Sequence, residues 1–254
     1  MMETVSDARQ KIIEALLNLG VHPGITLLVH SSLSSLGNIP GGAETVIDAL
    51  LHAVGPEGTL LMPALSYELV NDFQSVFDHA RTASNIGIIP EHFRKRKSVI
   101  RSIHPTHSVC GSGACAEAIL SGHESDNTPC GPNSPFRKIR DYEGFILMLG
   151  CGLRPNTSFH AIEELVHPPY LFRSFPLTYT IRTNENSTEK NYTVHNFEGW
   201  IQRYDRLRDV LGEPFLHKGK VLDATSWLIS VPEMWAAVLS KMQEDPLYFV
   251  DRDD

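Results

Sequence analysis

The sequence predicts an α/β protein with a parallel sheet in its first half. Two short apolar runs, Ile25–Val29 and Thr59–Met62, have the length and composition of buried strands. Between them a helical pattern opens at Gly41–Glu44 and continues to about Val54. A strand, a crossover helix and a second strand form a βαβ unit, whose strands run parallel with a right-handed connection. A third apolar run, Phe145–Gly150, predicts a further buried strand.

The other elements follow from the spacing of apolar residues and from glycine and proline breaks. Before the third run we expect a helix over 4–19, a loop over 66–85, and helices over 86–93, 114–120 and 134–140. After it we expect a hairpin of strands 177–182 and 191–195, a helix over 199–211, a strand over 219–222 and a helix over 224–240. The last helix carries Trp227 and Trp235, which we interpret as core residues.

Composition excludes several classes of function. The chain has 254 residues, 42% hydrophobic and 20% charged, with a formal net charge of −8, which is ordinary for a soluble globular protein. It has no basic stretch that suggests nucleic-acid binding and no apolar run near the roughly 18 residues of a membrane span. The N-terminus lacks the features of a signal peptide, and the 4 cysteines form no disulfide-type pattern, so we expect a cytoplasmic protein.

A serine-rich segment, His30–Gly37, follows the strand Ile25–Val29. Small hydroxyl residues just past a strand end are typical of a ligand rim in open α/β sheets. Serine hydroxyls and exposed backbone N–H groups can donate to carbonyl or phosphate oxygens. The segment is therefore either a ligand-binding rim or a plain surface loop.

The segment Arg154–Glu164 follows the strand Phe145–Gly150 and carries the most specific chemistry. Its residues 156–158, Asn-Thr-Ser, are of the types that cap helix N-termini, so we expect a polar turn that leads into a helix. His160 and Glu163 then lie three residues apart on one helical face. A carboxylate beside an imidazole raises its basicity and selects one tautomer, as a general base requires. The alternative is a capped helix with an ordinary histidine and glutamate.

Three potential metal ligands occur close together at His104, His107 and Cys110. Zinc sites use such spacings, but a closed site needs a fourth ligand, and none stands out. Pro105 also interrupts the continuous helix that would align the three side chains. We therefore expect no metal, and instead a strand whose polar residues line a cleft.

At this point the sequence resembles a known family, the aminoglycoside 3-N-acetyltransferases. The resemblance covers nearly the whole chain and rests on short motifs in the family's order. These are Val29-His-Ser-Ser-Leu33 with Gly41-Gly42, Gly58–Pro63, Phe77-Asp78, Gly87–Arg94, Arg101-Ser-Ile-His-Pro105 with Ser108, Ser134-Pro135, and Asn156-Thr-Ser-Phe-His160 with Glu163. Each motif is weak alone, but together and in this order they are specific.

The resemblance implies a single α/β domain over 1–254, with a three-layer αβα arrangement around a mixed, largely parallel sheet. A smaller C-terminal subdomain around 171–254 is compatible with it. It also implies transfer of an acetyl group from acetyl-CoA to an amine of an aminoglycoside or other amino sugar. The protein's partners would be coenzyme A and a small amine, with no nucleic acid and no membrane, and the chain would be a monomer or homodimer.

The resemblance also assigns roles to residues. His160 becomes the general base and Glu163 its partner. The coenzyme A site is carried over onto Ser32, Leu33, Ser34, Arg101, Ser102, His104, Ser108, Thr157 and Ser158. Ser158, or a backbone N–H of the Ser31–Ser34 loop, would donate to the oxyanion of the tetrahedral intermediate. No cysteine has an evident histidine partner, so we expect direct transfer in a ternary complex.

One departure leaves the acceptor open. Drug-modifying members of the family usually have an acidic residue just before the Asn-Thr-Ser motif, where this chain has Arg154-Pro155. A cation near the base repels a polycationic aminoglycoside and can pair with a phosphate or carboxylate. Two other hypotheses compete with the transferase: a metal-dependent hydrolase built on His104, His107 and Cys110, and a non-catalytic homologue that only binds coenzyme A.

Overall fold

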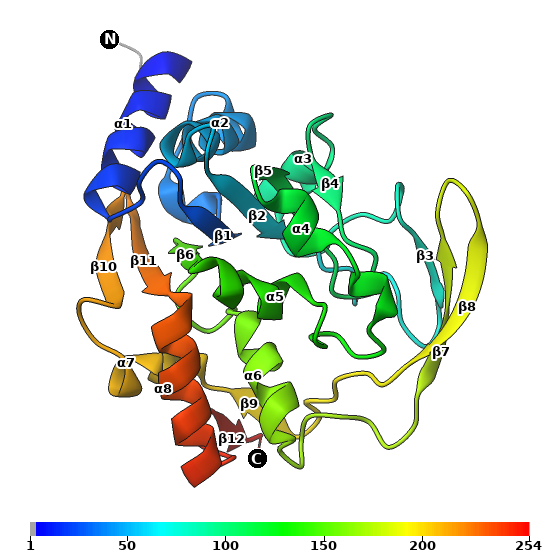
Figure 1. Ribbon diagram of the computed structural model, residues 1–254. Coiled ribbons are helices and arrows are strands. Elements are labelled where there is room, and N and C mark those ends of the chain that lie inside the picture. The colour runs from blue at the N-terminus through cyan, green and yellow to red at the C-terminus, as the bar shows by residue number, and fades with distance from the viewer. Residues whose placement is uncertain (1–3, 254) are drawn as a thin grey trace.

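The computed structural model describes residues 4–253, so the first three residues of the N-terminal stretch and the last residue of the predicted domain lie outside it. A seven-stranded sheet forms the centre, in the order β10-β11-β6-β1-β2-β5-β4 (Figure 1). Its strands are β1 (Thr26–Ser31), β2 (Thr59–Pro63), β4 (Ile100–Arg101), β5 (Val109–Gly113), β6 (Phe145–Leu149), β10 (Leu216–Val221) and β11 (Ala224–Ser230). The helix α2 (Gly42–Val54) connects β1 to β2, so the predicted βαβ unit is confirmed.

Helices cover both faces of this sheet, which confirms the three-layer αβα arrangement. One apolar core joins α1 (Val5–Asn18), α2 and α3 (Ile88–Arg94) to the sheet. The core on the other face joins α4 (Ala116–Leu120), α5 (Pro135–Lys138), α6 (Ser158–Val166), α7 (Leu207–Val210) and α8 (Val231–Glu244). Within β6, Leu147 and Leu149 enter the first core whereas Ile146 and Met148 enter the second, because successive strand residues point to opposite faces.

The sheet is mixed, as expected, but most of its strand pairs are antiparallel, whereas we expected most to be parallel. Only β1 pairs in parallel, with β2 on one side and β6 on the other. The pairs β2–β5, β4–β5, β6–β11 and β10–β11 are antiparallel. The parallel centre matters for function, because β1 and β6 both end at the same edge and deliver their following loops to one place.

A small lobe stands beside the main body at the right of Figure 1. It is a three-stranded sheet of β3 (Val76–Asp78), β7 (Leu177–Arg182) and β8 (Ser187–Tyr192), with its own apolar cluster around Phe77 and Tyr192. A two-stranded sheet pairs β9 (Trp200–Gln202) with β12 (Val250–Arg252). Residues 171–253 therefore contribute both to this lobe and, through β10, β11 and α8, to the main sheet and its layers.

Two C-terminal predictions were wrong. Residues 199–211 contain β9, a 3-10 turn at Tyr204–Arg206 and the short α7 in place of one helix. Residues 224–240 begin as β11, and the helix α8 starts only at Val231. The β11 stretch is buried between two neighbouring strands, so its apolar run resembles a buried helix in periodicity.

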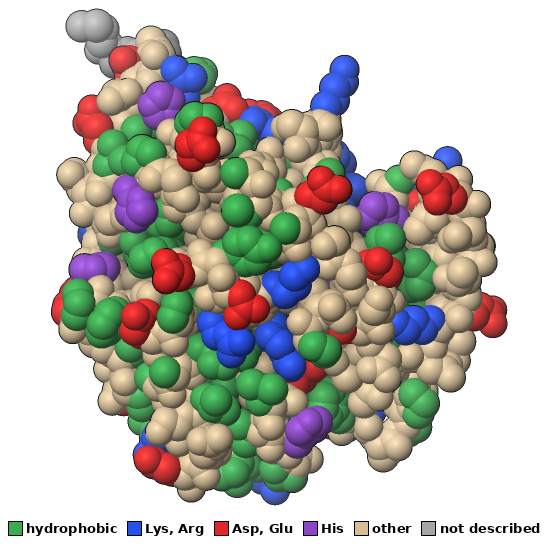
Figure 2. Space-filling model, viewed as in Figure 1, with side chains coloured by type: hydrophobic (Ala, Val, Ile, Leu, Met, Phe, Trp, Pro, Cys, Tyr) green, Lys and Arg blue, Asp and Glu red, His purple; other side chains and the backbone are tan. Residues whose placement is uncertain are grey.

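No helix within residues 4–253 has both the length and the apolar character to cross a bilayer. On the face shown in Figure 2, acidic and basic side chains are interspersed among apolar ones. The surface there has no continuous basic band.

Candidate active site

The strand β6 runs through a glycine turn into α6, as the sequence predicts. Gly150 and Gly152 adopt positive φ angles of 72° and 69°, which favour glycine because it has no Cβ. Thr157 is the N-cap residue, but its side chain makes no capping hydrogen bond. Asn156 serves instead, because its Oδ1 accepts from the Ser158 backbone N–H at 3.1 Å.

His160 and Glu163 form the predicted pair on α6. The imidazole Nδ1 lies 2.7 Å from Oε2 of Glu163, whose side chain is fully buried. Two tyrosine hydroxyls reach the same carboxylate: Tyr170 donates to Oε1 at 2.8 Å, and Tyr204 lies 3.0 Å from both oxygens. Burial raises the pKa of both tyrosines, so each stays a neutral donor. These contacts place the His160 proton on Nδ1 and leave Nε2 with its lone pair.

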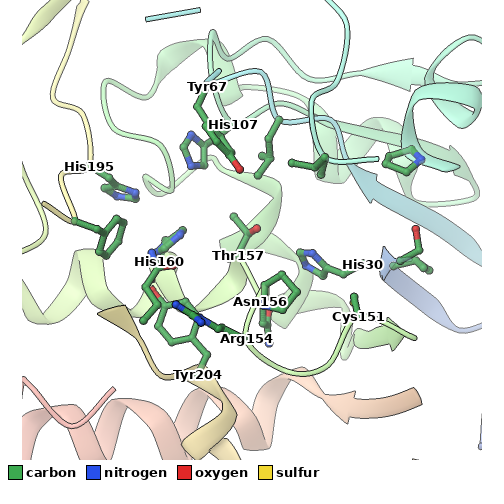
Figure 3. A pocket seen from close by; sticks show the side chains of 18 residues that line it. His30, Tyr67, His107, Cys151, Arg154, Asn156, Thr157, His160, His195 and Tyr204 are labelled. Atoms are coloured by element: carbon green, nitrogen blue, oxygen red, sulfur yellow. Dashed lines mark hydrogen bonds between the residues drawn. The ribbon is translucent and has the colours of Figure 1, made fainter. Parts of the chain in front are cut away.

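His160 opens into a cavity that encloses about 1260 Å³ of empty space, its open mouth included, at the edge of the sheet where β1 and β6 end (Figure 3). The labelled side chains around it come from distant parts of the chain. They are His30, Tyr67, His107, Cys151, Arg154, Asn156, Thr157, His160, His195 and Tyr204. None of the 18 lining residues is an aspartate or glutamate, and Arg154 is the one lysine or arginine among them.

A second, smaller cavity, which encloses about 1050 Å³ measured in the same way, lies over the serine-rich loop. Ser32, Leu33 and Ser34 line it together with Gly42 and the start of α3. Ser31, the last residue of β1, lines both cavities, so the two spaces meet at this residue. The hydroxyl oxygen of Ser31 is buried and has no hydrogen-bond partner among the described residues.

Burial keeps three imidazoles at the larger cavity uncharged, those of His30, His107 and His195. Burial lowers the pKa of His30 to about 3, and the nearby His160 adds to the shift. Burial also lowers the pKa values of His107 and His195 well below the ordinary value of a histidine. Cys151 lines the same cavity, and burial raises the pKa of its thiol to about 12, so it is not a thiolate at neutral pH.

Comparison with known proteins identifies the fold and the family. The sequence model of the aminoglycoside 3-N-acetyltransferases matches residues 28–243. Aminoglycoside N(3)-acetyltransferase IV from a Salmonella species is 33% identical over 245 residues, which is 95% of this chain and 90% of that protein. The chain belongs to the aminoglycoside 3-N-acetyltransferase family. As a member of it, the chain is an acyltransferase.

Solved structures agree with this membership. A mutant of aminoglycoside acetyltransferase AAC(3)-IVa in complex with a gentamicin is 32% identical, with a TM-score of 0.82 over 95% of this chain and 90% of that one. AAC-IIIb, solved with CoASH, has a TM-score of 0.81 at 24% identity, covering 95% of this chain and 97% of that chain. The second likeness, at that identity, shows the shared fold.

Some of the residues predicted to bind coenzyme A lie at the walls of the two cavities. Ser32, Leu33 and Ser34 line the smaller cavity, and Thr157 lines the larger one. Ser158 lines neither, and its hydroxyl is fully buried without a partner among the described residues. Its side chain is therefore poorly placed for the oxyanion role that the resemblance suggests.

The predicted residues between 101 and 108 also line neither cavity. The Arg101 guanidinium donates to Ser108 Oγ at 2.8 Å and to the carbonyl oxygens of His79, Thr82 and Ala64. Ser108 in turn donates to Ala64 at 2.9 Å. These bonds tie β4 and β5 to the loop after β2, which makes Arg101 and Ser108 internal supports. A coenzyme A contact by either one stays a prediction.

Ser102 and His104 are similarly enclosed. The Ser102 hydroxyl accepts from the Val109 backbone and lies 3.0 Å from His123 Nδ1. His104 accepts from the backbone N–H groups of Thr106 and His107, and its ring stacks on His123. Among the described residues, no three histidine, cysteine, aspartate or glutamate side chains converge into a group that could hold a metal. The hydrolase hypothesis built on His104, His107 and Cys110 therefore lacks its site.

Sequence reasoning missed the residues that hold the two glutamates of α6 from a distance: Tyr170, His195 and Tyr204. Tyr170 and Tyr204 reach Glu163 across 7 and 41 positions. His195 reaches Glu164 across 31 positions. No local pattern marks such partners, because the fold brings them together.

Proposed function

We propose that this family member transfers the acetyl group of acetyl-CoA directly to an amine, with His160 as the general base. The observation that carries the proposal is the His160–Glu163 pair, which presents a lone pair on Nε2 at the wall of the larger cavity. An ammonium cannot attack a thioester, so the acceptor must first lose a proton. A correctly placed base is worth roughly 10² to 10⁴ in rate.

The two cavities supply separate places for the two substrates. The smaller one, along the serine-rich loop, suits the coenzyme A arm, and the larger one contains the base. AAC-IIIb, which shares the fold, was solved with CoASH. In the reaction, the uncharged amine nitrogen bonds to the acetyl carbon and one of its protons passes to Nε2 of His160. The carbon–sulfur bond then breaks, and the departing thiolate takes that proton from His160.

The Ser31 hydroxyl is the best-placed donor for the oxyanion of the intermediate. It lies where the two cavities meet and has no partner of its own among the described residues. Among the backbone candidates, the Ser32 N–H already donates to the Leu149 carbonyl. A donor with no competing partner is available as negative charge develops on the carbonyl oxygen.

The acceptor in this proposal is a sugar amine that also carries an anion. AAC(3)-IVa was solved with a gentamicin, and the relatives' names point to aminoglycosides. Yet the wall of the larger cavity here carries no carboxylate to match a polycation, and Arg154 is exposed there without an ion pair among the described residues. A guanidinium pairs in two-pronged fashion with phosphate or carboxylate.

A thiol-release assay with a matched panel of acceptors tests both the acetyl transfer and the proposed class of acceptor. Glucosamine and glucosamine 6-phosphate differ only in the phosphate, and gentamicin supplies a polycation. We expect the phosphorylated amine to have the highest kcat/KM, and Arg154→Gln to remove most of that advantage. Robust gentamicin turnover with none on anionic amino sugars refutes the acceptor class; an enzyme that neither binds acetyl-CoA nor acetylates any amine refutes the transferase.

Chelation separates this function from the metal-dependent hydrolase. EDTA should leave acetyl transfer unchanged and would abolish a zinc hydrolase. The non-catalytic alternative is tested by the same assay, because it predicts acetyl-CoA binding with no thiol release on any amine.

A further inference from the structure

Two consecutive glutamates of α6 each hold a histidine at the wall of the larger cavity. Glu163 holds His160, as described. The next residue, Glu164, lies 2.8 Å from Nε2 of His195, which belongs to the segment after β8. Both members of this second pair are nearly inaccessible, with side chains 6% and 3% exposed. The proposed mechanism does not use them.

The bonds around Glu164 fix the tautomer of His195. Oε1 of Glu164 accepts from the Cys130 backbone N–H at 2.8 Å, and Oε2 accepts from the Thr128 hydroxyl at 2.6 Å. Both carboxylate oxygens are thus occupied as acceptors, so the contact with His195 requires a proton on Nε2. The neutral ring then carries its lone pair on Nδ1, on the side of the ring away from Glu164.

This Nδ1 atom is buried and has no hydrogen-bond partner among the described residues. A buried acceptor without a partner is costly, at roughly the strength of a lost hydrogen bond, and is uncommon in folded proteins. The backbone also holds His195 in place, because the residue forms an isolated antiparallel bridge with Phe172. The backbone bridge and the Nε2 contact with Glu164 therefore both orient the ring, while Nδ1 keeps an unused lone pair.

The position of the ring relates it to the proposed base. The centroids of His195 and His160 are 4.9 Å apart with the planes at 60°, and His107 completes a triangle at 5.6 and 6.2 Å (Figure 3). All three residues line the larger cavity. An amine that approaches His160 thus passes the ring of His195, whose Nδ1 has no hydrogen-bond partner among the described residues.

We infer that His195 is an acceptor-binding residue, whose Nδ1 accepts a hydrogen bond from an N–H or O–H of the acceptor beside the reacting amine. Glu164 is a positioning residue that fixes the Nε2-protonated tautomer. This inference rests on the proposed transfer to an amine and adds a specificity determinant to it. The site selects acceptors with a donor next to the nucleophilic nitrogen, such as a vicinal amino alcohol of a sugar.

Replacing His195 by residues with amide side chains tests the roles of its two ring nitrogens separately. In His195→Asn the side-chain oxygen can occupy the Nδ1 position, whereas in His195→Gln the amide reaches the Nε2 position; His195→Phe keeps the ring volume and removes both. We expect the acceptor KM to stay within about threefold in the Asn variant and to rise about tenfold or more in the Gln and Phe variants, as for the loss of one hydrogen bond. The KM for acetyl-CoA should not change.

Glu164→Gln is the matched control for positioning, since its amide oxygen can still accept from Cys130 and His195. It should resemble the wild type, whereas Glu164→Leu should raise the acceptor KM like His195→Phe. Removing the hydroxyl next to the amine, by comparing 2-aminocyclohexanol with cyclohexylamine, should raise KM in the wild type and have little effect in His195→Phe. An unchanged KM in His195→Phe overturns the inference.

Nitrogen-15 NMR spectra of the histidine rings report the tautomer of His195 without a measurement of activity. His195 should show a protonated Nε2 and a bare Nδ1, and the Nδ1 resonance should move on addition of the acceptor together with coenzyme A. A ring protonated on Nδ1 overturns the inference while acetyl transfer stands. A wild-type enzyme that acetylates no amine removes the proposed function and this inference together.

Discussion

Nδ1 of His160 and Oε2 of Glu163 lie 2.7 Å apart, on adjacent turns of one short helix. The carboxylate is fully buried, so its charge needs compensation, and two tyrosine hydroxyls provide it together with the imidazole. A buried carboxylate with this many donors has little freedom to move. The imidazole that it holds is thus oriented before any substrate arrives, which saves reorganisation in the transition state.

His160→Ala should abolish acetyl transfer with little loss of acetyl-CoA affinity. The substitution removes the proposed base but leaves the smaller cavity intact. We expect kcat to fall by roughly 10² to 10⁴, as for loss of general base catalysis. Thiol release and acetyl-CoA calorimetry measure the two quantities. Unchanged turnover would eliminate His160 as the base.

Tyr204→Phe should lower kcat more than Tyr170→Phe. The Tyr204 hydroxyl lies 3.0 Å from both Glu163 oxygens and 3.1 Å from His160 Nδ1, whereas Tyr170 donates to one oxygen only. We expect roughly a tenfold loss in the first variant and a few-fold loss in the second, from one removed hydrogen bond to a buried charge. Thermal unfolding controls for general destabilisation. Equal effects on kcat would contradict the special position of Tyr204.

Ser31→Ala should lower kcat without changing either KM. The hydroxyl has no partner within residues 4–253, so its removal breaks no internal bond. Loss of one oxyanion donor typically costs about 10² to 10³ in kcat. Ser31→Cys, with a weak donor of similar size, is the matched control and should retain more activity than the alanine variant only if donation is the function. Wild-type kcat in Ser31→Ala would move the oxyanion site elsewhere.

Cys151→Ala should retain turnover, and mass spectrometry should detect no acetylated protein during the reaction. Cys151 lines the larger cavity, so it is the cysteine best placed to become an acyl-enzyme. Burial keeps its pKa at about 12, and a neutral thiol is a poor nucleophile. Initial-rate patterns should be those of a ternary complex. Parallel, ping-pong lines with a trapped acetyl-cysteine would replace direct transfer by a covalent route.

Local patterns predicted the parts of the site that lie close in sequence. The spacing of His160 and Glu163 on one helix, and the serine loop after β1, could be predicted because each depends on a single element and its periodicity. Tyr204 could not, because it was assigned to a helix while a 3-10 turn carries it. His195 lies just past a hairpin strand whose bounds were also inexact, and only the fold brings it to Glu164.

The motif around Arg101 shows a different limit of sequence reasoning. A run of polar residues can support a site from behind as well as contact a ligand. Arg101 uses its guanidinium on three backbone carbonyls and Ser108, so the run between β4 and β5 acts as an internal brace. Composition cannot distinguish internal support from ligand contact, because both need the same residue types. The burial and the hydrogen-bond partners of each side chain distinguish them.

The stability of the protein should fall as the pH drops from about 7 toward 5. Five histidines are buried with lowered pKa values, those of His30 and His123 at about 3. The others are His104, His107 and His195. Burial is the first cause in every case, because it penalises the charged ring. Such a histidine remains neutral in the folded protein while the unfolded chain takes up a proton near 6.5.

The direction follows from proton linkage. A histidine with a lowered pKa contributes stability that is fully present above pH 6.5 and is lost as the pH falls from 6.5 toward 3, by about 1.4 kcal/mol per pH unit for each ring. Glu164 and Asp126 oppose this trend, because burial raises the pKa of each carboxyl and the folded state then binds a proton first. Two carboxyls cannot offset five imidazoles. Urea unfolding at pH 7.5, 6.5, 5.5 and 5.0 measures the slope, and His123→Gln should reduce it by about one ring's contribution. A free energy of unfolding that stays level across this range would show that the five rings are accessible to protons in the folded state.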